Sequence, residues 1–280
     1  MNTTTPTLAQ ALTQARTLGL ERIDAQMLLL HALARPDAGR AWLLAHDTDA
    51  LEPAAHDAFM ALCQRRAAGE PVAYLTGRKE FYGLQLAIDA RVLDPRPDTE
   101  TLVDWALEVI APLPAPRVLD LGTGSGAIAL ALQHQHPMAQ VLAVDASADA
   151  LAVAQANAQR LALPVRFALG HWLDSVEGRF DAILSNPPYI AAADPHLAAL
   201  SHEPLQALAS GADGLDDIRA IVAQAPAHLA PGGWLLLEHG HDQAEAVGTL
   251  LRVQGFAQVQ SRNDLAGIAR CTGGQWPTVK

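Results

Sequence analysis

The sequence predicts a doubly wound α/β sheet, preceded by a small helical bundle and a connecting β-hairpin. Beyond residue 117, short apolar runs typical of strands alternate with longer segments of helical periodicity. This alternation favours a parallel sheet with helices on both faces. Only helical patterns occur before residue 70, and an alternating segment around Gly83 is typical of a hairpin. We therefore divide the chain into a helical domain (residues 1–75), a hairpin linker (76–95) and an α/β domain (96–280).

The helical domain is predicted from apolar residues that recur at helical spacing. Thr7 is a suitable cap for the first helix, and Gly19 is a suitable stop. Helices are expected at residues 8–18, 23–33 and 53–68, with only a short turn at residues 41–45. A domain of this kind indicates a recognition or docking role rather than a catalytic one.

The elements of the α/β domain follow in alternation. Strands are expected at residues 117–121, 140–145, 165–169, 180–185 and 234–238. Helices are expected at residues 101–110, 127–135, 148–161, 215–229 and 243–254. The tail, at residues 257–261 and 268–272, is predicted to form a hairpin that closes the edge of the sheet.

Composition and charge limit the classes of function. The 280 residues carry a formal net charge of −11, with 19 Lys+Arg against 30 Asp+Glu, so we expect no direct nucleic-acid partner. Cys63 and Cys271 lie far apart in the sequence and imply neither a disulfide framework nor a metal site. The N-terminus lacks a signal-peptide pattern and no segment is apolar for long enough to span a bilayer. We expect a cytoplasmic monomer with no membrane partner.

A glycine-rich turn joins the first strand of the α/β domain to a helix. Residues 122–126 read Gly-Thr-Gly-Ser-Gly, and glycines there permit positive φ and the close approach of a ligand. Their spacing differs from the G-x-G-x-x-G of dinucleotide-binding proteins. Asp145 ends the next strand, where a carboxylate can accept hydrogen bonds from both hydroxyls of a ribose. Asp120, at the edge of the turn, favours a ligand that carries an ammonium group.

Asn186-Pro187-Pro188-Tyr189 stands directly after the apolar run at residues 180–185. A residue before proline is held extended, and proline has a fixed φ and no N–H, so the segment is a stiff rim of acceptors. The Asn186 side-chain carbonyl and the Pro187 carbonyl can accept both N–H protons of a planar nitrogen, while Tyr189 offers a ring face. Orienting such a nitrogen is what its attack on an electrophile requires.

Together these parts fit S-adenosylmethionine. This cofactor carries a methyl group that is already activated, so the protein has only to bind and align the reactants and to let the nitrogen lose its proton. A nicotinamide-dependent oxidoreductase is disfavoured by the glycine spacing. A non-catalytic nucleotide-binding module would have no use for the rim at residues 186–189. An amino-methyltransferase of adenine or cytosine would share that rim but would be expected to carry a basic target-recognition region.

Over essentially its full length the chain resembles the bacterial release-factor glutamine methyltransferases, the PrmC/HemK family. The resemblance rests on the Asp-Pro-Arg-Pro-Asp-Thr-Glu box at residues 94–100, residues 120–128, 144–145, 186–190, 203–208, 211–215 and 235–240. It implies methylation of N5 of the glutamine in the Gly-Gly-Gln motif of class-I peptide chain release factors. Methylation of a ribosomal-protein glutamine is a close alternative. The resemblance also implies that residues 1 to about 75 help to dock the release factor.

The site residues carried over from this resemblance form two groups. The catalytic group would be Asn186, Pro187, Pro188 and Tyr189. The group that binds S-adenosylmethionine would be Gly122, Thr123, Gly124, Ser125, Gly126, Asp145, Trp172 and Asn186, with Trp172 beside the adenine and no metal required.

The sequence departs from the family pattern before Trp172, where His171 replaces an acidic residue, and before Glu203, where it has Ser201-His202. Two His-x-His pairs, at residues 134–136 and 239–241, lack metal-ligand spacing. Gly273-Gly274-Gln275 spells the supposed substrate tripeptide, which we interpret as a chance match in a glycine-rich turn.

Overall fold

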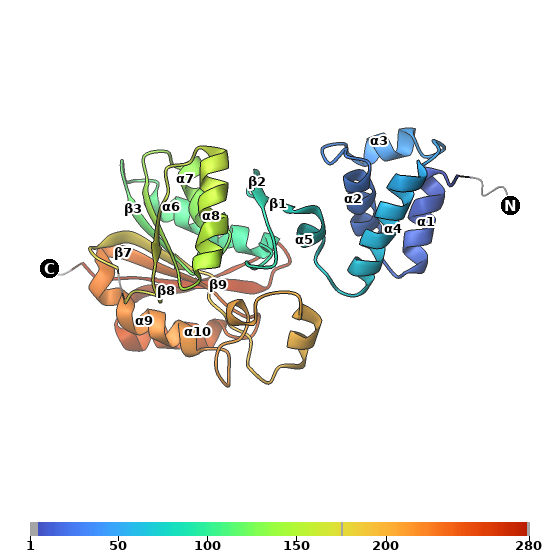
Figure 1. Ribbon diagram of the computed structural model, residues 1–280. Helices are drawn as coiled ribbons and strands as arrows, with labels where there is room; N and C mark the ends of the chain where they lie inside the picture. The colour runs from blue at the N-terminus through green and yellow to red at the C-terminus, as the bar shows by residue number, and fades with distance from the viewer. Residues whose placement is uncertain (1–4, 175, 279–280) are drawn as a thin grey trace. The chain divides into compact units, whose positions relative to one another are not determined.

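The helical unit ends at Arg78 in the computed structural model, which describes residues 5–174 and 176–278. It contains α1 (Leu8–Thr17), α2 (Arg22–Ala32), α3 (Arg40–Ala45), α4 (Pro53–Ala67) and α5 (Val72–Thr76) (Figure 1). Thr7 caps α1 in a reciprocal box with Gln10: the Thr7 hydroxyl accepts from the Gln10 N–H, and the Gln10 side chain accepts from the Thr7 N–H. Residues 41–45 belong to a short helix rather than the expected turn, because Leu43 is buried in the core of this unit.

The second unit begins at Lys79, within the expected hairpin. β1 (Arg78–Phe81) and β2 (Leu84–Ala87) are joined by Tyr82 and Gly83, with φ of 50° and 79°. Positive φ at both turn residues is the geometry that suits the twist of a two-residue hairpin. Asn157 ties the hairpin to the glycine-rich turn, since its Nδ2 donates to the carbonyls of Ala87 and Ser125 at 3.0 Å each.

A seven-stranded sheet forms the core of this unit. Its strands are β3 (Arg117–Leu121), β4 (Gln140–Asp145), β5 (Arg166–Leu169), β6 (Phe180–Ser185), β7 (Leu229–Glu238), β8 (Ala257–Asn263) and β9 (Ala269–Gln275). Their order across the sheet is β5-β4-β3-β6-β7-β9-β8. The chain runs outward from β3 in one direction and from β6 in the other, so the direction of winding reverses between β3 and β6.

Helices cover both faces of the sheet. The short 3₁₀ helix η1 (Pro97–Thr99) leads into α6 (Glu100–Ile110), which lies with α7 (Ala127–Gln135) and α8 (Ala148–Leu161) on one face, and α9 (Asp216–His228) and α10 (Ala244–Gln254) cover the other (Figure 1). Leu119, Ile183 and Leu235 pack against Ile218 of α9 and Leu251 of α10 in one buried cluster. Two 3₁₀ helices, η2 (Pro195–Leu200) and η3 (Leu205–Ala207), lie in the segment between β6 and α9.

The hairpin expected for the tail is confirmed: β8 and β9 pair antiparallel at the edge of the sheet, which is therefore mixed. The order of these two strands was not predicted, because β9 inserts between β7 and β8 and pairs antiparallel with both. β7 begins at Leu229, before the expected residue 234, and a register shift against β6 accommodates Pro231 and the two glycines that follow. Gly273 and Gly274 lie within strand β9, so the glycine-rich turn expected for them was wrong.

Candidate functional site

The candidate site lies at the carboxyl ends of β3, β4 and β6, at the reversal of winding where ligands bind in open α/β sheets. A cavity of about 330 Å³ opens there, within the usual size range of small-molecule sites. Its lining includes Leu93, Gly122, Gly124, Asp145, Ser147, His171, Trp172, Asn186, Pro188, Gln206 and Asp217. The glycine turn and the Asn-Pro-Pro-Tyr segment, which we expected to act together, thus border one cavity through Gly122, Gly124, Asn186 and Pro188. The other predicted residues of these two features, Thr123, Ser125, Gly126, Pro187 and Tyr189, are not among its lining residues.

Most backbone N–H groups of the glycine turn form hydrogen bonds inside the protein. The N–H groups of Gly122 and Thr123 both donate to the Val144 carbonyl, at 2.8 and 3.0 Å, and that of Gly126 donates to the Thr123 carbonyl. Gly122, Gly124 and Gly126 have φ of 70°, 54° and 85°, which favours glycine at each position. A Cβ at Gly122 would lie 3.2 Å from the Trp172 ring. The turn therefore contributes mainly by allowing a ligand to approach its backbone closely, and less by donating hydrogen bonds into the cavity.

Asp145 is held in place by backbone donors on both sides. Its two carboxylate oxygens accept from Gly124 N at 2.8 Å and from Ser147 N at 2.9 Å. Each oxygen keeps a lone pair, so an aligned carboxylate that lines the cavity can still accept from two adjacent hydroxyls. A glycine floor, this carboxylate and the Trp172 indole are the groups that a nucleoside such as that of S-adenosylmethionine needs, and we conclude that the residues present fit it.

Asp120 lies beneath the turn rather than at its edge. The residue is fully buried; one oxygen accepts from the Thr123 hydroxyl at 2.6 Å and the other has no partner. Burial raises the pKa of Asp120 to about 7, and the nearby Asp145 charge acts in the same direction. Asp120 is not among the residues that line the cavity, so the expected contact of its carboxylate with an ammonium group stays a prediction.

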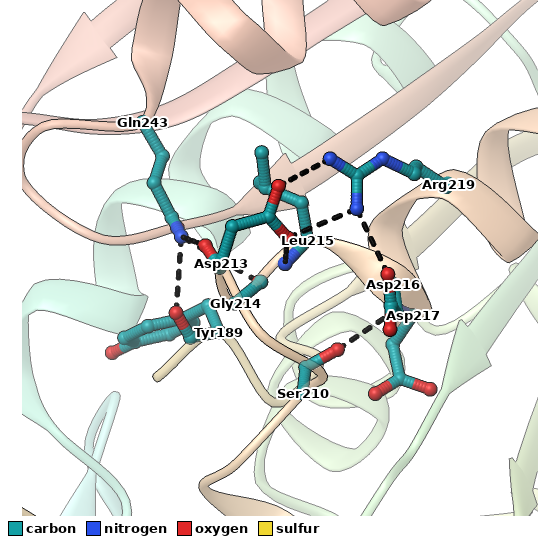
Figure 2. Close-up of polar contacts among 9 residues, drawn as sticks. All are labelled: Tyr189, Ser210, Asp213, Gly214, Leu215, Asp216, Asp217, Arg219 and Gln243. Atoms are coloured by element: carbon teal, nitrogen blue, oxygen red, sulfur yellow. Dashed lines mark hydrogen bonds and ion pairs between the residues drawn. The ribbon is translucent and has the colours of Figure 1, made fainter. Parts of the chain in front are cut away.

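The Trp172 side chain is held in place by a residue at the start of α9. Its backbone has φ of 49°, unusual for a residue with a Cβ, and its side chain is 8% exposed. The indole Nε1–H donates to Asp217 Oδ1 at 3.0 Å. The Asp217 N–H in turn donates to the Ser210 hydroxyl at 2.9 Å (Figure 2). The ring beside the glycine turn is therefore oriented by the start of α9.

The Asn186–Tyr189 segment leaves β6 through trans peptide bonds. Asn186 and Pro188 line the cavity, and both prolines are buried. Asn186 Nδ2 donates to the Thr99 hydroxyl at 3.3 Å. The Tyr189 hydroxyl lies 3.5 Å from Glu238 Oε1, and burial raises the pKa of Tyr189 well above its ordinary value.

Gln243 holds the backbone of Tyr189 from α10's side. Figure 2 shows its side-chain amide directed at two carbonyl oxygens, that of Tyr189 at 3.0 Å and that of Asp213 at 3.3 Å. Gly214, with φ of 77°, passes so close to the Tyr189 carbonyl that a Cβ would overlap it. Tyr189 is thus bound at its hydroxyl and at its carbonyl.

An ion pair between the buried Glu203 and the half-buried Arg96 joins the Asp94–Glu100 box to the segment between β6 and α9. Glu203, 8% exposed, pairs with Arg96 and accepts from the Asp94 N–H at 3.2 Å. Asp94 pairs in turn with Lys79 at 3.1 Å and with Arg96 at 3.4 Å. Residues on both sides of this junction, Leu93 and Gln206 among them, line the cavity, so the pair holds its rim together.

The remaining residues singled out from the sequence lie in different places. His171 lines the cavity, whereas Ser201 and His202 do not. His239 is buried, with Nε2 2.8 Å from the Thr272 hydroxyl, and is not among the residues that line the cavity. No cluster of three or more His, Cys, Asp or Glu side chains is placed to bind a metal ion within residues 5–174 and 176–278. Nor does the described part of the chain contain a helix long and apolar enough to cross a membrane.

The tripeptide Gly273-Gly274-Gln275 is part of the packed sheet. A Cβ at Gly273 would lie 2.6 Å from the Leu236 side chain, and one at Gly274 would lie 2.9 Å from Phe256. The Gln275 Nε2 donates to the Gly232 carbonyl at 2.9 Å. Close packing explains both glycines here, so the match with the substrate tripeptide needs no functional explanation.

Comparison with known proteins places the chain in a family. A model described as "PrmC N-terminal domain" matches residues 7–77, and one described as "Methyltransferase small domain" matches residues 103–211. A release factor glutamine methyltransferase of Bordetella pertussis is 53% identical over 260 residues, which cover 91% of this chain and 95% of that protein. The chain belongs to the release factor glutamine methyltransferase family. The resemblance seen in the sequence is thereby confirmed, as are the methyltransferase class and S-adenosylmethionine as the cofactor.

Solved structures confirm the fold of the α/β unit. The hMettl16 catalytic domain in complex with an RNA hairpin matches with a TM-score of 0.59 and 17% identity, covering 78% of this chain and 82% of that one. The Thermus thermophilus 16S rRNA N2 G1207 methyltransferase, solved in complex with AdoMet and guanosine, matches with a TM-score of 0.53 and 20% identity. It covers 71% of this chain and 49% of that one. The class I S-adenosylmethionine-dependent methyltransferase sheet expected from the sequence is the fold observed.

Sequence reasoning missed the residues that support the site from behind. Thr99, Glu203, Asp217, Gln243 and Glu238 make the contacts described above, and each comes from a segment distant in the chain from its partner. In the Asp94–Glu100 box, Asp98 pairs with Arg270 at 3.3 Å, and Glu100 accepts from the Tyr82 N–H at 2.9 Å. Thr99, Glu203 and Glu238 lie within motifs that carried the family resemblance, which was the available signal.

Proposed function

We propose that this chain carries out the reaction for which its family is named, on class-I peptide chain release factors. The methyl group of S-adenosylmethionine is transferred to N5 of the glutamine in their Gly-Gly-Gln motif. The observation that carries this proposal is that Asn186 and Pro188 border the same cavity as Gly122, Asp145 and Trp172. Groups suited to a planar amide and groups suited to a nucleoside thus meet in one space.

The cofactor half of the cavity is assigned to residues 122–126, Asp145 and Trp172. Asp145 would accept from the ribose hydroxyls with the oxygens that Gly124 and Ser147 hold in line. Trp172 would bind the adenine, and the imidazole of His171, also on the cavity wall, could accept from the adenine amino group. When bound, S-adenosylmethionine supplies a methyl group on a positively charged sulfur.

The substrate half is assigned to Asn186, Pro187, Pro188 and Tyr189. An amide nitrogen is a poor nucleophile because its lone pair is delocalised into the carbonyl. Asn186 Oδ1 and the Pro187 carbonyl accept the two N–H protons of the glutamine amide and hold the nitrogen still. Tyr189 packs its ring on the plane of the amide, and Pro188 closes the wall of the cavity. The surplus proton leaves to solvent, so no strong general base is needed.

The helical unit is proposed to dock the release factor. A cavity of about 440 Å³ lies within this unit and is lined by Arg22, Arg40 and Arg78 together with Ile23 and Met27. Ile23 and Met27 are 66% and 44% exposed. Exposed apolar side chains framed by arginines, in a chain of net charge −11, suit a protein segment that combines apolar and acidic residues. We further propose a monomer that works in the cytoplasm, where release factors act, and that neither nucleic acid nor a membrane is a direct partner.

The test is transfer of label from S-adenosylmethionine. The purified chain is incubated with labelled cofactor and, in separate reactions, a release factor, DNA and RNA. Label is expected on the release factor alone, and it is lost when the glutamine of the Gly-Gly-Gln motif is replaced. Label on DNA or RNA instead would favour the amino-methyltransferase alternative.

Asn186→Ala is expected to lower turnover by at least about 100-fold while the affinity for S-adenosylmethionine, measured by calorimetry, changes little. Asn263→Ala, at an exposed position of β8, is the matched control and should behave as the wild type. Full turnover by the Asn186 variant would refute the assignment of the amide-holding rim.

A further inference from the structure

A second carboxylate, besides that of Asp145, lies on the wall of the cavity. Asp217, in the first turn of α9, is half-buried and is one of the residues that line the cavity. Its neighbour Asp216 is exposed and pairs with Arg219 at 2.8 Å. Figure 2 shows the Asp217 carboxylate turned away from that guanidinium. Asp217 is therefore placed to face a ligand rather than to neutralise a charge of the protein itself.

The Asp217 carboxylate is oriented by the protein but is only partly used by it. Trp172 Nε1–H donates to Oδ1 at 3.0 Å, and the Asp217 N–H donates to the Ser210 hydroxyl at 2.9 Å. An ionised carboxylate has about four acceptor sites, and the indole N–H occupies one of them. In the described part of the chain no other group bonds to this carboxylate, so Oδ2 is left as an acceptor on the cavity wall.

His171 is the other acceptor beside Trp172, and it is less well placed. Its side chain is 62% exposed, and its ring meets the Trp172 indole edge to face at a centroid distance of 5.5 Å. Water competes for the hydrogen bonds of a group so exposed. The Asp217 carboxylate is more buried and charged, and hydrogen bonds to a charged acceptor are about twice as strong as neutral ones.

We propose that Asp217 is the residue that recognises the adenine amino group of S-adenosylmethionine. This inference rests on the proposed function, in which the adenine lies beside Trp172, the ring that Asp217 holds. The 6-amino group of adenine has protons to donate and an ionised carboxylate can only accept, so the two groups match. The same carboxylate would repel the 6-oxo group of hypoxanthine or guanine. One side chain thus orients the indole and selects the base.

Asp217→Asn tests the proposal because Trp172 determines which way the new amide faces. An indole N–H can only donate, so the asparagine Oδ1 accepts from it and the NH₂ replaces Oδ2. A donor then faces the adenine amino group, which is also a donor, whereas the 6-oxo group of hypoxanthine can accept from it. The hold on Trp172 is kept, and the preference for the base is reversed.

The probes are S-adenosylhomocysteine and S-inosylhomocysteine, which differ only in the base, and their Kd values are measured by calorimetry. The wild type is expected to bind the adenosyl compound roughly 10- to 100-fold more tightly. In Asp217→Asn the affinity for the adenosyl compound should fall by a similar factor, while that for the inosyl compound should be unchanged or higher. The difference at N1 of the base is common to both proteins, so it cancels when their preferences are compared.

Two control variants and one alternative role make the outcome specific. Asp216→Asn, in the same turn of α9 but outside the cavity lining, and His171→Ala should both keep the wild-type preference within about threefold. A role of Asp217 confined to holding Trp172 would change the affinity for both compounds by one factor and leave the preference as it is. That result, or a preference lost in His171→Ala and kept in Asp217→Asn, would overturn the proposal.

Folding and the proposed function are checked separately. Thermal denaturation without ligand shows which variants are folded at the temperature of the calorimetry. The preference of the wild type needs no variant, and equal Kd values for the two compounds would by themselves refute the proposal. Labelling of the release factor by the wild type is measured in parallel. Its absence would refute the proposed function, whereas normal labelling with an unchanged preference in Asp217→Asn would refute only the role of Asp217.

Discussion

Replacement of Gly214 by alanine tests whether the backbone of Tyr189 must be held where the structure has it. Gly214 has φ of 77°, and an added Cβ would lie 2.9 Å from the Tyr189 carbonyl carbon and closer still to its oxygen. The same Cβ would lie 2.8 Å from the Gln243 Nε2 that binds this carbonyl. The carbonyl must therefore move by about 1 Å to restore an ordinary van der Waals separation.

Two costs are expected from Gly214→Ala, and they differ in kind. A left-handed backbone with a Cβ costs about 1–2 kcal/mol of stability. A displacement of about 1 Å in a group that orients the substrate costs about 100-fold in turnover. Because the movement also breaks the Gln243 hydrogen bond, a further loss of about 1 kcal/mol of stability is expected.

Gly267→Ala is the matched control for the backbone cost. Gly267 has φ of 82°, belongs to the same unit, and has no atom within 4 Å of an added Cβ. Both variants should lose stability in urea denaturation, but only Gly214→Ala should lose turnover in the labelling assay. If the two variants had equal turnover, the argument that Tyr189 is positioned through its carbonyl would be refuted.

Two further outcomes follow from the buried carboxyl of Asp120 and from the arginines of the helical unit. The folded-state pKa of Asp120, about 7 against an ordinary 3.8, means that its neutral form is favoured, so its contribution to stability is greatest below pH 4 and is lost as the pH rises through 7. The unfolding free energies of wild type and Asp120→Asn should therefore diverge by about 4 kcal/mol between pH 4 and pH 8, in favour of the variant; a constant difference would contradict the assigned pKa. Arg22→Ala with Arg40→Ala should raise the KM for release factor about tenfold with kcat unchanged. An unchanged KM would count against docking at this cavity.

The sequence predicted the centre of the α/β unit with little error. The bounds of β3, β4 and β6 agree with the expected ones, because each strand is a short apolar run ended by a polar or glycine residue. Strand bounds and strand order were predicted less well where pairing between strands, rather than the local sequence, decides them. β7 starts at Leu229, before a proline and two glycines, since pairing with β6 resumes on both sides of the irregularity. The insertion of β9 between β7 and β8 leaves no local trace in the sequence.

The same distinction applies to the candidate site. Residues at strand ends, such as Asp145 and Asn186, could be predicted because parallel strands bring their carboxyl ends to one edge of the sheet. Glu238 also ends a strand, but the sequence does not show that it is buried beside Tyr189. Asp217 and Gln243 could not be assigned a role from the sequence, because their partners are brought near only by the packing of α9 and α10.

The two halves of the cavity are held by one segment of chain, residues 208–217. The Leu208 carbonyl accepts from the Tyr189 N–H at 3.2 Å, and Gly214 presses on the Tyr189 carbonyl, so this segment sets the substrate side. Asp217 accepts from Trp172, so the same segment sets the cofactor side. Methyl transfer needs the two sides aligned within a fraction of an ångström. A short segment tied to both is a direct way to keep that alignment, because a shift of the segment moves the two sides together.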